Sequence, residues 1–285
     1  MSKPGGKTAF VLACGGSLGA IQVGMLDELV RAGVVPDFIV GSSVGALNAG
    51  LFAGDPTPRG VARLSLIWRS LRRGDVFPMT LGNLVQWLRN ADALFDPSNL
   101  RRLIEQNLPY RLLEEAQIPV HVVATTLGGE SVRLSSGPAV EAILASAAIP
   151  VVFPSVQIAA EHLIDGAISG NTPILAAADL GADRMVVLPT GFACALPAPP
   201  SGAAARGFHA LTLLIAHQMV RDLAQLAGTI EVFTVPSLCP LATSPFDFSQ
   251  TEDLIARSAA QTRIWLAAGG LQRPQVPEAL LAHSH

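Results

Sequence analysis

Short, mostly apolar runs alternate along this chain with longer segments in which apolar residues recur at helical spacing. The clearest runs cover residues 8–13, 38–40, 184–189 and 230–235. Such runs are typical of strands in a sheet that is covered on both faces. A helix follows the first of them, with Ile21, Met25 and Leu29 on one face and Gly33 at its end. The repeated order of strand and helix predicts an α/β protein with a mostly parallel central sheet and helices on both faces.

The remaining elements are less regular. Further extended segments are predicted over 119–126, 131–135, 151–158 and 162–167, the first two as a hairpin. A short helix of small residues is predicted over 139–148, and a long apolar helix over 208–226. Thr172 and Pro173 have the residue types of a helix cap and first turn. Ser249 and Glu252 have the spacing of a capping box, which predicts a final helix that reaches Ala268.

We interpret residues 1–285 as a single domain. The Pro- and Ala-rich stretch over 196–206 predicts a mobile surface loop, and the tail over 270–285 is expected to fray. Residues 59–111 hold nine basic and four acidic residues, and amphipathic helices are predicted around Trp68 and over 81–88. Two interpretations remain open for this helical, cap-like segment. It consists either of ordinary core-facing helices or of a cap over the site that also meets lipid.

The composition excludes several classes of protein. Half of the 285 residues are hydrophobic and 14% are charged, yet no apolar run reaches the length of about 18 residues that a membrane span needs. A net charge of −3 argues against nucleic acid as a partner. The three cysteines are odd in number and far apart, so they predict neither a disulfide framework nor a zinc site. We read the apolar N-terminus as a strand rather than a secretion signal, and expect a cytoplasmic protein.

The strand over 38–40 leads into Gly41-Ser42-Ser43-Val44-Gly45, which matches the G-x-S-x-G pattern of a nucleophile elbow. The elbow needs glycine on both sides of the serine because a Cβ there would meet the incoming strand or the outgoing helix. The pattern therefore predicts that Ser43 is a nucleophile held at a helix N-terminus, where backbone N–H groups favour negative charge.

A serine nucleophile needs a base and donors for the oxyanion. The backbone N–H groups of Gly15 and Gly16, in a strand-to-helix loop, are the candidate donors. Asp165 ends a predicted strand, where active-site residues of open α/β sheets gather, although an Asp before Gly is also common in plain turns. The alternative base is a histidine from the long helix, His209 or His217, as in a Ser-His-Asp esterase.

Four blocks of this sequence together resemble the patatin-like phospholipases, a family that includes patatin and cytosolic phospholipase A2. The blocks are VLACGGSLGAIQVGML (11–26), GSSVGALNAG (41–50), ASAAIPVVFPSV (145–156) and DGAISGNTPI (165–174). The resemblance implies a three-layer α/β/α fold and a lipid acyl hydrolase that works through a Ser-Asp dyad without a catalytic histidine. Carried over to this chain, the dyad is Ser43 and Asp165, and Gly15 and Gly16 form the oxyanion hole.

Two positions depart from the family's loop. Cys14 replaces the first glycine of its triple, and Leu18 stands where a basic residue is usual. The lost charge favours neutral esters over phospholipids. The resemblance implies a lipid or fatty-acyl ester substrate, no metal and no organic cofactor; the basic segment over 59–111 adds the expectation of peripheral contact with anionic membranes. A non-catalytic lipid-binding protein of the same fold is the remaining alternative. The sequence does not indicate an oligomeric state.

Overall fold

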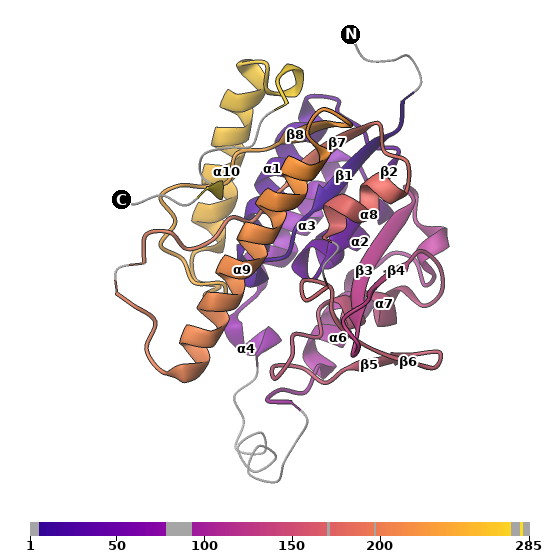
Figure 1. The fold of residues 1–285 in the computed structure, drawn as a ribbon, viewed down its shortest axis with the longest axis vertical. Coiled ribbons are helices and arrows are strands. Elements are labelled where there is room, and N and C mark those ends of the chain that lie inside the picture. Colours follow the sequence, from indigo (N-terminus) through magenta and orange to yellow (C-terminus); the bar gives the residue numbers. More distant parts are fainter. Residues whose placement is uncertain (1–5, 78–92, 170–171, 197, 275–279, 282–285) are drawn as a thin grey trace.

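The computed structural model describes residues 6–77, 93–169, 172–196, 198–274 and 280–281. Within these residues one sheet of eight strands forms the centre of the molecule (Figure 1). Its strands run in the order β5 (Val156–Ile158), β6 (Glu161–Asp165), β3 (Val120–Thr126), β2 (Phe38–Ser42), β1 (Thr8–Leu12), β7 (Arg184–Leu188) and β8 (Glu231–Thr234).

The five neighbours from β3 to β8 are parallel, which confirms the predicted mostly parallel sheet. Strand β6 pairs antiparallel with both β3 and the edge strand β5. Strand β4 (Ser131–Leu134) pairs antiparallel with β3 as the predicted hairpin.

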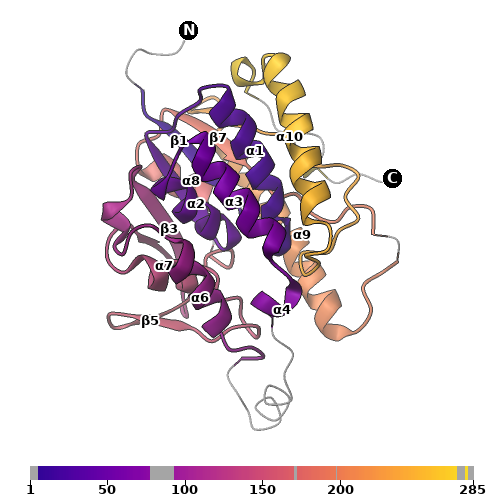
Figure 2. The same cartoon turned by 180° about the vertical axis from the view of Figure 1, so that it is seen from behind.

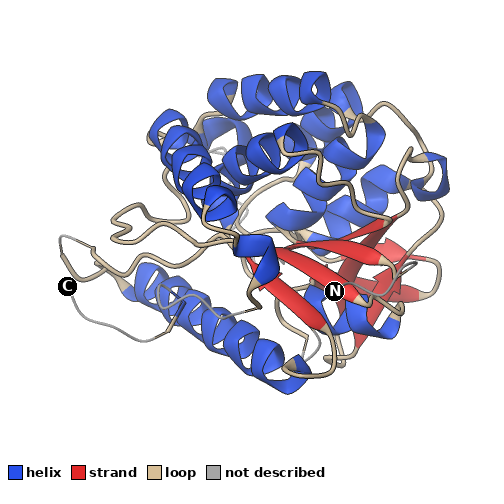
Figure 3. Ribbon diagram, turned by 90° about the horizontal axis from the view of Figure 1, so that it is seen from above, coloured by secondary structure: helices blue, strands red, loops and turns tan. Residues whose placement is uncertain are grey.

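Helices cover both faces of the sheet, as Figure 3 shows most clearly. One layer holds α1 (Gly19–Arg31), α2 (Val44–Gly54), α3 (Pro58–Ser70), α6 (Ser98–Asn107), α7 (Ala139–Ser146) and α10 (Thr251–Ala267), which face the viewer in Figure 2. The opposite layer holds α8 (Pro173–Asp179) and α9 (Ala203–Leu226), which are labelled in Figure 1. The arrangement is a three-layer α/β/α fold.

Alternate residues of each central strand face opposite layers, because side chains alternate across a pleated strand. In β1, Phe10 and Leu12 belong to the core beneath α1 and α2, whereas Ala9 and Val11 belong to the core beneath α8 and α9. All four are fully buried. This two-sided burial explains why the strand reads as a continuous apolar run instead of an alternating pattern.

Several predicted element boundaries were wrong. The extended segment over 151–158 is a turn up to residue 153, with Val151 at a φ of 72°, and only its last three residues form β5. Helix α9 begins at Ala203, so the final four residues of the predicted loop over 196–206 are its first turn. In the C-terminal tail, Leu280 is 1% exposed and packs in the core beneath α8 and α9.

Two predicted capping hydrogen bonds do not form, because the side chains have other partners. Thr172 and Pro173 take the predicted N-cap and first-turn positions of α8, but the Thr172 hydroxyl donates to Asp222 Oδ2 at 2.5 Å instead of accepting from the helix backbone. No side chain caps α10, whose preceding residue is Gln250, and Glu252 pairs instead with Arg69 of α3 at 2.5 Å. Long-range pairing has displaced both local bonds.

The cap-like segment over 59–111 contains α3, α6 and the short α4 (Arg73–Val76); the helix predicted over 81–88, and Trp87 with it, lies outside the described residues. Trp68, at the centre of the first predicted amphipathic helix, is only 2% exposed. Among the described residues, no helix combines the length and the apolarity that crossing a membrane would require.

Two of the three cysteines are far apart in the sequence but lie next to each other in the fold. Cys194 follows β7 and Cys239 follows β8, and their Sγ atoms are 4.0 Å apart without a disulfide bond. The loops that carry them are also joined by a bond from the Ala195 N–H to the Leu241 carbonyl, at 3.0 Å. Parallel neighbouring strands thus bring together two thiols that the sequence separates by 45 residues.

Candidate active site

The predicted elbow is present between β2 and α2. Ser43 has a φ of 55° and a ψ of −125°, a left-handed conformation that is costly for a side chain and common at functional sites. A Cβ on Gly41 would lie 2.4 Å from the Gly45 carbonyl oxygen, and one on Gly45 would lie 2.1 Å from the Leu12 carbonyl oxygen. Both glycines are therefore required by close backbone approach, as the pattern predicted.

Ser43 and Asp165, which are 122 residues apart, meet at this elbow. The Ser43 hydroxyl donates to Asp165 Oδ2 at 2.6 Å. The second carboxylate oxygen accepts from the Ala167 N–H at 2.8 Å. Strand β6 pairs with β3 and brings Asp165 opposite Ala124. The exposed fractions are 5% for Ser43 and 2% for Asp165, so this hydrogen bond is shielded from water.

Burial changes the acidity of the carboxyl group. Desolvation raises the pKa of Asp165 from its ordinary value of 3.8 to about 6, although the bonds from Ser43 and Ala167 oppose the shift. A carboxylate with this pKa is a stronger base than an exposed one and is still largely ionised at neutral pH. The arrangement can therefore accept a proton from the serine hydroxyl.

Gly166 explains why glycine follows Asp165. A Cβ at this position would lie 2.1 Å from the Val123 carbonyl oxygen and 2.6 Å from Ser42 Oγ. Because β2 and β3 leave no room for a side chain here, glycine is required after Asp165 by close packing and not only by the preference of turns for an Asp-Gly pair.

Ser146, at the end of α7, is a site residue that sequence reasoning missed. Its hydroxyl accepts from the Ser43 N–H at 2.8 Å and donates to the Val123 carbonyl oxygen at 2.5 Å. The residue is fully buried. It thus ties the strained backbone of the elbow to β3. Its position in the block over 145–156 was the available signal, but that block assigns it no role.

Gly15 and Gly16 lie in the loop between β1 and α1, beside Ser43. Gly16 has a φ of 57°, and a Cβ on it would lie 2.5 Å from the Pro245 carbonyl oxygen. A Cβ on Gly15 would lie 2.1 Å from Thr190 Oγ1. Within the described residues, no protein group accepts a hydrogen bond from the N–H of either glycine. The donors of an oxyanion hole must likewise have no acceptor within the protein.

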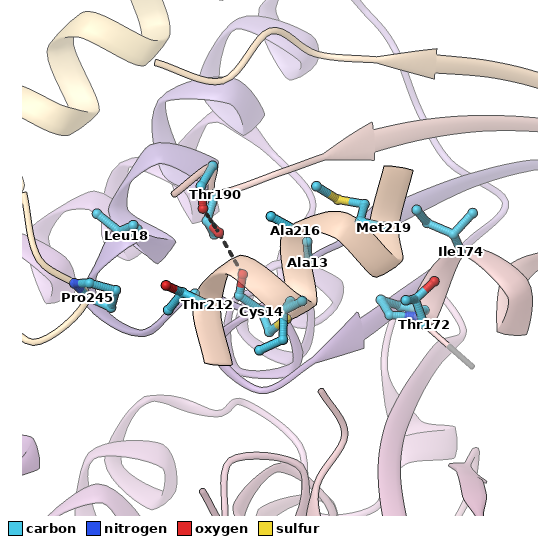
Figure 4. A pocket seen from close by; sticks show the side chains of 14 residues that line it. Ala13, Cys14, Leu18, Thr172, Ile174, Thr190, Thr212, Ala216, Met219 and Pro245 are labelled. Atoms are coloured by element: carbon cyan, nitrogen blue, oxygen red, sulfur yellow. Dashed lines mark hydrogen bonds between the residues drawn. The ribbon is translucent and has the colours of Figure 1, made fainter. Parts of the chain in front are cut away.

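Cys14 is accommodated next to the glycines. Its carbonyl oxygen accepts from the Thr190 hydroxyl at 2.6 Å (Figure 4). Burial, and secondarily the Asp165 charge, raise the pKa of the Cys14 thiol to about 12. The thiol is therefore neutral and acts here as a small apolar side chain.

A buried polar network connects this loop to the elbow helix. Gln22 donates to the carbonyl oxygens of Ala13 and Leu188 at 2.7 and 3.0 Å. Asn48 donates to Gln22 Oε1 at 2.8 Å and accepts from Trp68 Nε1 at 2.8 Å. The network joins α1, α2 and α3 to the ends of β1 and β7, so it fixes the glycine loop relative to Ser43.

Ser43 stands between two cavities. The first, which we call the aromatic cavity, runs beneath α3 and α6 and is lined by apolar side chains that include Trp68, Phe77, Phe153 and Phe248. The second, the α9 cavity, is lined by Asp165 and by Ile215 of α9. Ser43, Gly16 and Ile149 line both cavities.

A third space, the rear cavity, adjoins the α9 cavity. It lies between the end of β1 and the helices α8 and α9, with Thr212, Ala216 and Met219 along one side (Figure 4). Cys14, Gly15, Thr212, Ile215 and Pro245 line both spaces. The site therefore continues from Ser43 towards the second layer of helices.

The candidate histidines lie elsewhere. His209 lines another cavity, which adjoins the α9 cavity through Thr212, Pro245 and Phe246, and His217 is exposed on α9. Neither lines the two cavities that Ser43 lines. Within the described part of the chain, no three His, Cys, Asp or Glu side chains are grouped to hold a metal ion.

Comparisons with solved structures give long but distant matches, including the following two. VipD from Legionella pneumophila is 15% identical with a TM-score of 0.47, covering 92% of this chain and 67% of that one. Human GIVD cytosolic phospholipase A2, solved with methyl γ-linolenyl fluorophosphonate, is 13% identical with a TM-score of 0.46, covering 96% of this chain and 59% of that one.

Comparisons of sequence are more specific. Patatin-like phospholipase domain-containing protein 7 of Rattus norvegicus is 24% identical over 190 residues, which are 66% of this chain and 14% of that protein. The uncharacterized protein YjjU of Escherichia coli (strain K12) is 29% identical over 198 residues, 65% of this chain and 52% of that protein. The chain thus spans about half or less of these relatives. The family model described as Patatin-like phospholipase matches residues 10–178, more than half of the chain. The protein therefore belongs to the patatin-like phospholipase family.

Proposed function

We propose that this protein is a lipid acyl hydrolase that cleaves carboxylic esters through an acyl-serine intermediate, with Ser43 as nucleophile and Asp165 as base. The observation that carries the proposal is the 2.6 Å hydrogen bond between the two side chains at a buried nucleophile elbow. A serine hydroxyl and its base must be within hydrogen-bond reach, and this pair is.

In the acylation step, Ser43 Oγ attacks the ester carbonyl carbon while its proton passes to Asp165 Oδ2. The tetrahedral oxyanion is stabilised by the N–H groups of Gly15 and Gly16, and by the positive end of α2. Asp165 then gives the proton to the oxygen of the departing alcohol, and the acyl-serine remains.

In the second step, a water molecule takes the place of the alcohol. Asp165 accepts a proton from this water as its oxygen attacks the acyl-serine. The second tetrahedral intermediate collapses, Ser43 Oγ recovers its proton from Asp165, and the carboxylic acid leaves. The raised pKa of Asp165 suits both directions of transfer, because the group can gain and lose a proton near neutral pH.

A lipid substrate is supported by the aromatic cavity. Its described lining is apolar and aromatic, and it opens at Ser43. Burying an acyl chain there would remove apolar surface from water, at roughly 0.8 kcal/mol for each methylene group. Family membership agrees with a substrate of this kind.

The test is hydrolysis of p-nitrophenyl butanoate by the wild-type protein and two variants. Ser43→Ala should abolish turnover above the uncatalysed rate, and Asp165→Asn should lower kcat by several orders of magnitude because the amide cannot accept the proton. A fluorophosphonate should label the wild-type protein at Ser43 and leave Ser43→Ala unlabelled.

His209→Ala and His217→Ala serve as controls for the alternative base. Both should stay within about tenfold of the wild-type rate, since neither histidine lines the cavities at Ser43. If a histidine variant were folded but inactive, that histidine would be the base, and a Ser-His-Asp triad would replace the proposed dyad in the mechanism. Absence of both turnover and labelling in the wild type would favour a non-catalytic lipid-binding protein.

A further inference from the structure

The two cavities that meet at Ser43 are chemically different in one respect. Asp165 lines the α9 cavity and is not part of the lining of the aromatic cavity. If the proposed function holds, the same carboxyl group must deliver a proton to the alcohol oxygen as it leaves. That oxygen therefore has to face Asp165, and the group attached to it has to extend into the space on that side.

The acyl chain is attached to the other side of the ester carbonyl, away from the departing oxygen. The aromatic cavity is the other space that Ser43 lines, and its lining contains no titratable side chain among the described residues. The orientation of the ester thus follows from the position of a single proton donor.

The lining of the α9 and rear cavities also limits what the alcohol part can be. No lysine, arginine or histidine is among the described residues that line either space. The threonine hydroxyls there already donate within the protein: Thr190 to the Cys14 carbonyl, Thr212 to the His209 carbonyl, and Thr172 to Asp222.

An anionic alcohol part would be disfavoured in this environment. The charged group in the α9 cavity is the carboxylate of Asp165, so a phosphate would meet charge of its own sign with no cation to offset it. In a phospholipid the phosphate lies only a few bonds from the ester oxygen, so it would enter the same space. Neutral, apolar groups avoid this cost.

We propose that the ester lies across Ser43 with its acyl chain in the aromatic cavity and an uncharged, apolar alcohol part in the α9 and rear cavities. The substrate class is accordingly the neutral ester with two apolar parts, such as a glyceride or an ester of a long-chain alcohol. The proposal rests on the proposed function. It goes beyond that function because it fixes the orientation of the bound ester and the charge of its alcohol part.

Two matched variants test the orientation. Leu103→Trp of α6 narrows the aromatic cavity, and Ile215→Trp of α9 narrows the α9 and rear cavities. Both residues are half-buried helix positions that take the same new side chain. Leu103→Phe and Ile215→Phe replace them if either tryptophan variant loses its cooperative thermal unfolding.

Two ester series are measured with each protein. In the p-nitrophenyl series the acyl chain is butanoyl or decanoyl, and in the alkyl butanoate series the alcohol is ethanol or decanol. We expect Leu103→Trp to lower the decanoyl-to-butanoyl ratio of kcat/KM at least about tenfold, and Ile215→Trp to lower the decyl-to-ethyl ratio similarly, because even one methylene in a pocket is worth about tenfold or more. Each variant should keep the other ratio near the wild-type value.

The outcomes are distinguishable. If Leu103→Trp lowered the alcohol ratio and Ile215→Trp the acyl-chain ratio, the ester would bind in the reverse orientation. Equal effects of both variants on both ratios, or no effect, would also overturn the proposed orientation. A wild-type rate on p-nitrophenyl butanoate no higher than that of Ser43→Ala would instead refute the proposed function itself.

The charge of the alcohol part is tested with dioleoylglycerol and dioleoyl phosphatidic acid, each presented in neutral detergent micelles. The wild type should release fatty acid at least about tenfold faster from the glyceride, which corresponds to about 1.4 kcal/mol. Thr212→Lys places a cation in the α9 and rear cavities, and Thr212→Met fills similar space without charge. The lysine variant should lower the glyceride-to-phosphatidate ratio severalfold relative to the methionine variant. Equal wild-type rates on the two lipids, or equal ratios for the two variants, would overturn this part.

Discussion

Asp165 is the residue whose ionisation should control the rate. The group must be charged to accept the Ser43 proton, and burial raises its pKa to about 6. Because the protonated form predominates below that value, kcat/KM should fall about tenfold for each pH unit below 6 and level off above it. A pH profile of p-nitrophenyl butanoate hydrolysis measures this.

The control for this profile is Asp165→Asn, whose residual rate should lack the inflection near pH 6. A wild-type rate that stays constant down to pH 4.5 would contradict the prediction, since it would mean that no carboxyl group of raised pKa is needed.

Two serines beside the nucleophile have contrasting environments. Ser146 Oγ accepts from the Ser43 N–H, whereas Ser42 Oγ is buried without any hydrogen-bond partner among the described residues. Ser146→Ala would leave the Ser43 N–H unpaired at a cost of about 1–3 kcal/mol. We expect kcat to fall about tenfold or more, because the strained elbow loses the contact that holds it.

Ser42→Ala is the matched control, since it removes a buried hydroxyl that has no partner to lose. It should retain most of the activity and should not lower the midpoint of urea unfolding. Similar losses of kcat in both serine variants would show that the elbow is held by other contacts.

At the scale of elements, the helices of the segment 59–111 border the site. Trp68, Leu71, Phe77, Leu100 and Leu103 all line the aromatic cavity. The segment is also rich in arginine, and Arg69, Arg72 and Arg73 are exposed near the end of α3. Each basic residue near an anionic membrane can add up to about 1 kcal/mol of attraction.

We therefore expect weak, salt-sensitive binding to anionic vesicles that the Arg69/Arg72/Arg73→Ser variant loses. Co-sedimentation with phosphatidylglycerol vesicles at low and high salt measures it. Arg31/Arg133/Arg221→Ser removes the same charge from three exposed positions on α1, β4 and α9. Equal sedimentation of the two variants would mean that the segment simply packs on the core.

Periodicity and motifs predicted the central strands and the elbow, because each depends on local residue types. The catalytic dyad of Ser43 and Asp165 came only from the family resemblance, and its role stays a prediction. The two failed capping bonds and the missed role of Ser146 share one physical cause, which is pairing between distant segments. Glu252 pairs with Arg69 instead of capping its own helix, and the Thr172 hydroxyl donates to Asp222. Ser146 could not be assigned for the same reason, since its partners come from β2 and β3.

At the scale of the whole molecule, the buried hydrogen-bond network around Gln22 contributes to the stability of the fold. It joins three helices to two strands through bonds that are all buried. Gln22→Leu would leave the Ala13 and Leu188 carbonyl groups and Asn48 with fewer partners. We expect the free energy of unfolding to fall by about 2–4 kcal/mol, measured by urea denaturation.

Gln117→Leu is a suitable comparison for this change. The Gln117 side chain also donates to a backbone carbonyl, that of Gly54, but the residue is exposed. Water can replace its bond, so the free energy of unfolding should change by no more than about 0.5 kcal/mol. Equal losses of unfolding free energy in the two variants would show that the buried network stabilises the fold no more than an exposed hydrogen bond does.

The pair of thiols behind β7 and β8 has a consequence for how the protein is stored and assayed. The Sγ atoms of Cys194 and Cys239 are 4.0 Å apart, so an approach of about 2 Å would bring them to the bond length of about 2.05 Å that a disulfide needs. Diamide should therefore oxidise this pair, with a mass loss of two hydrogen atoms, and the cross-link should raise the thermal midpoint. Cys239→Ser should abolish both changes. Melting temperatures recorded with and without a reducing agent would then describe two covalent forms of one chain.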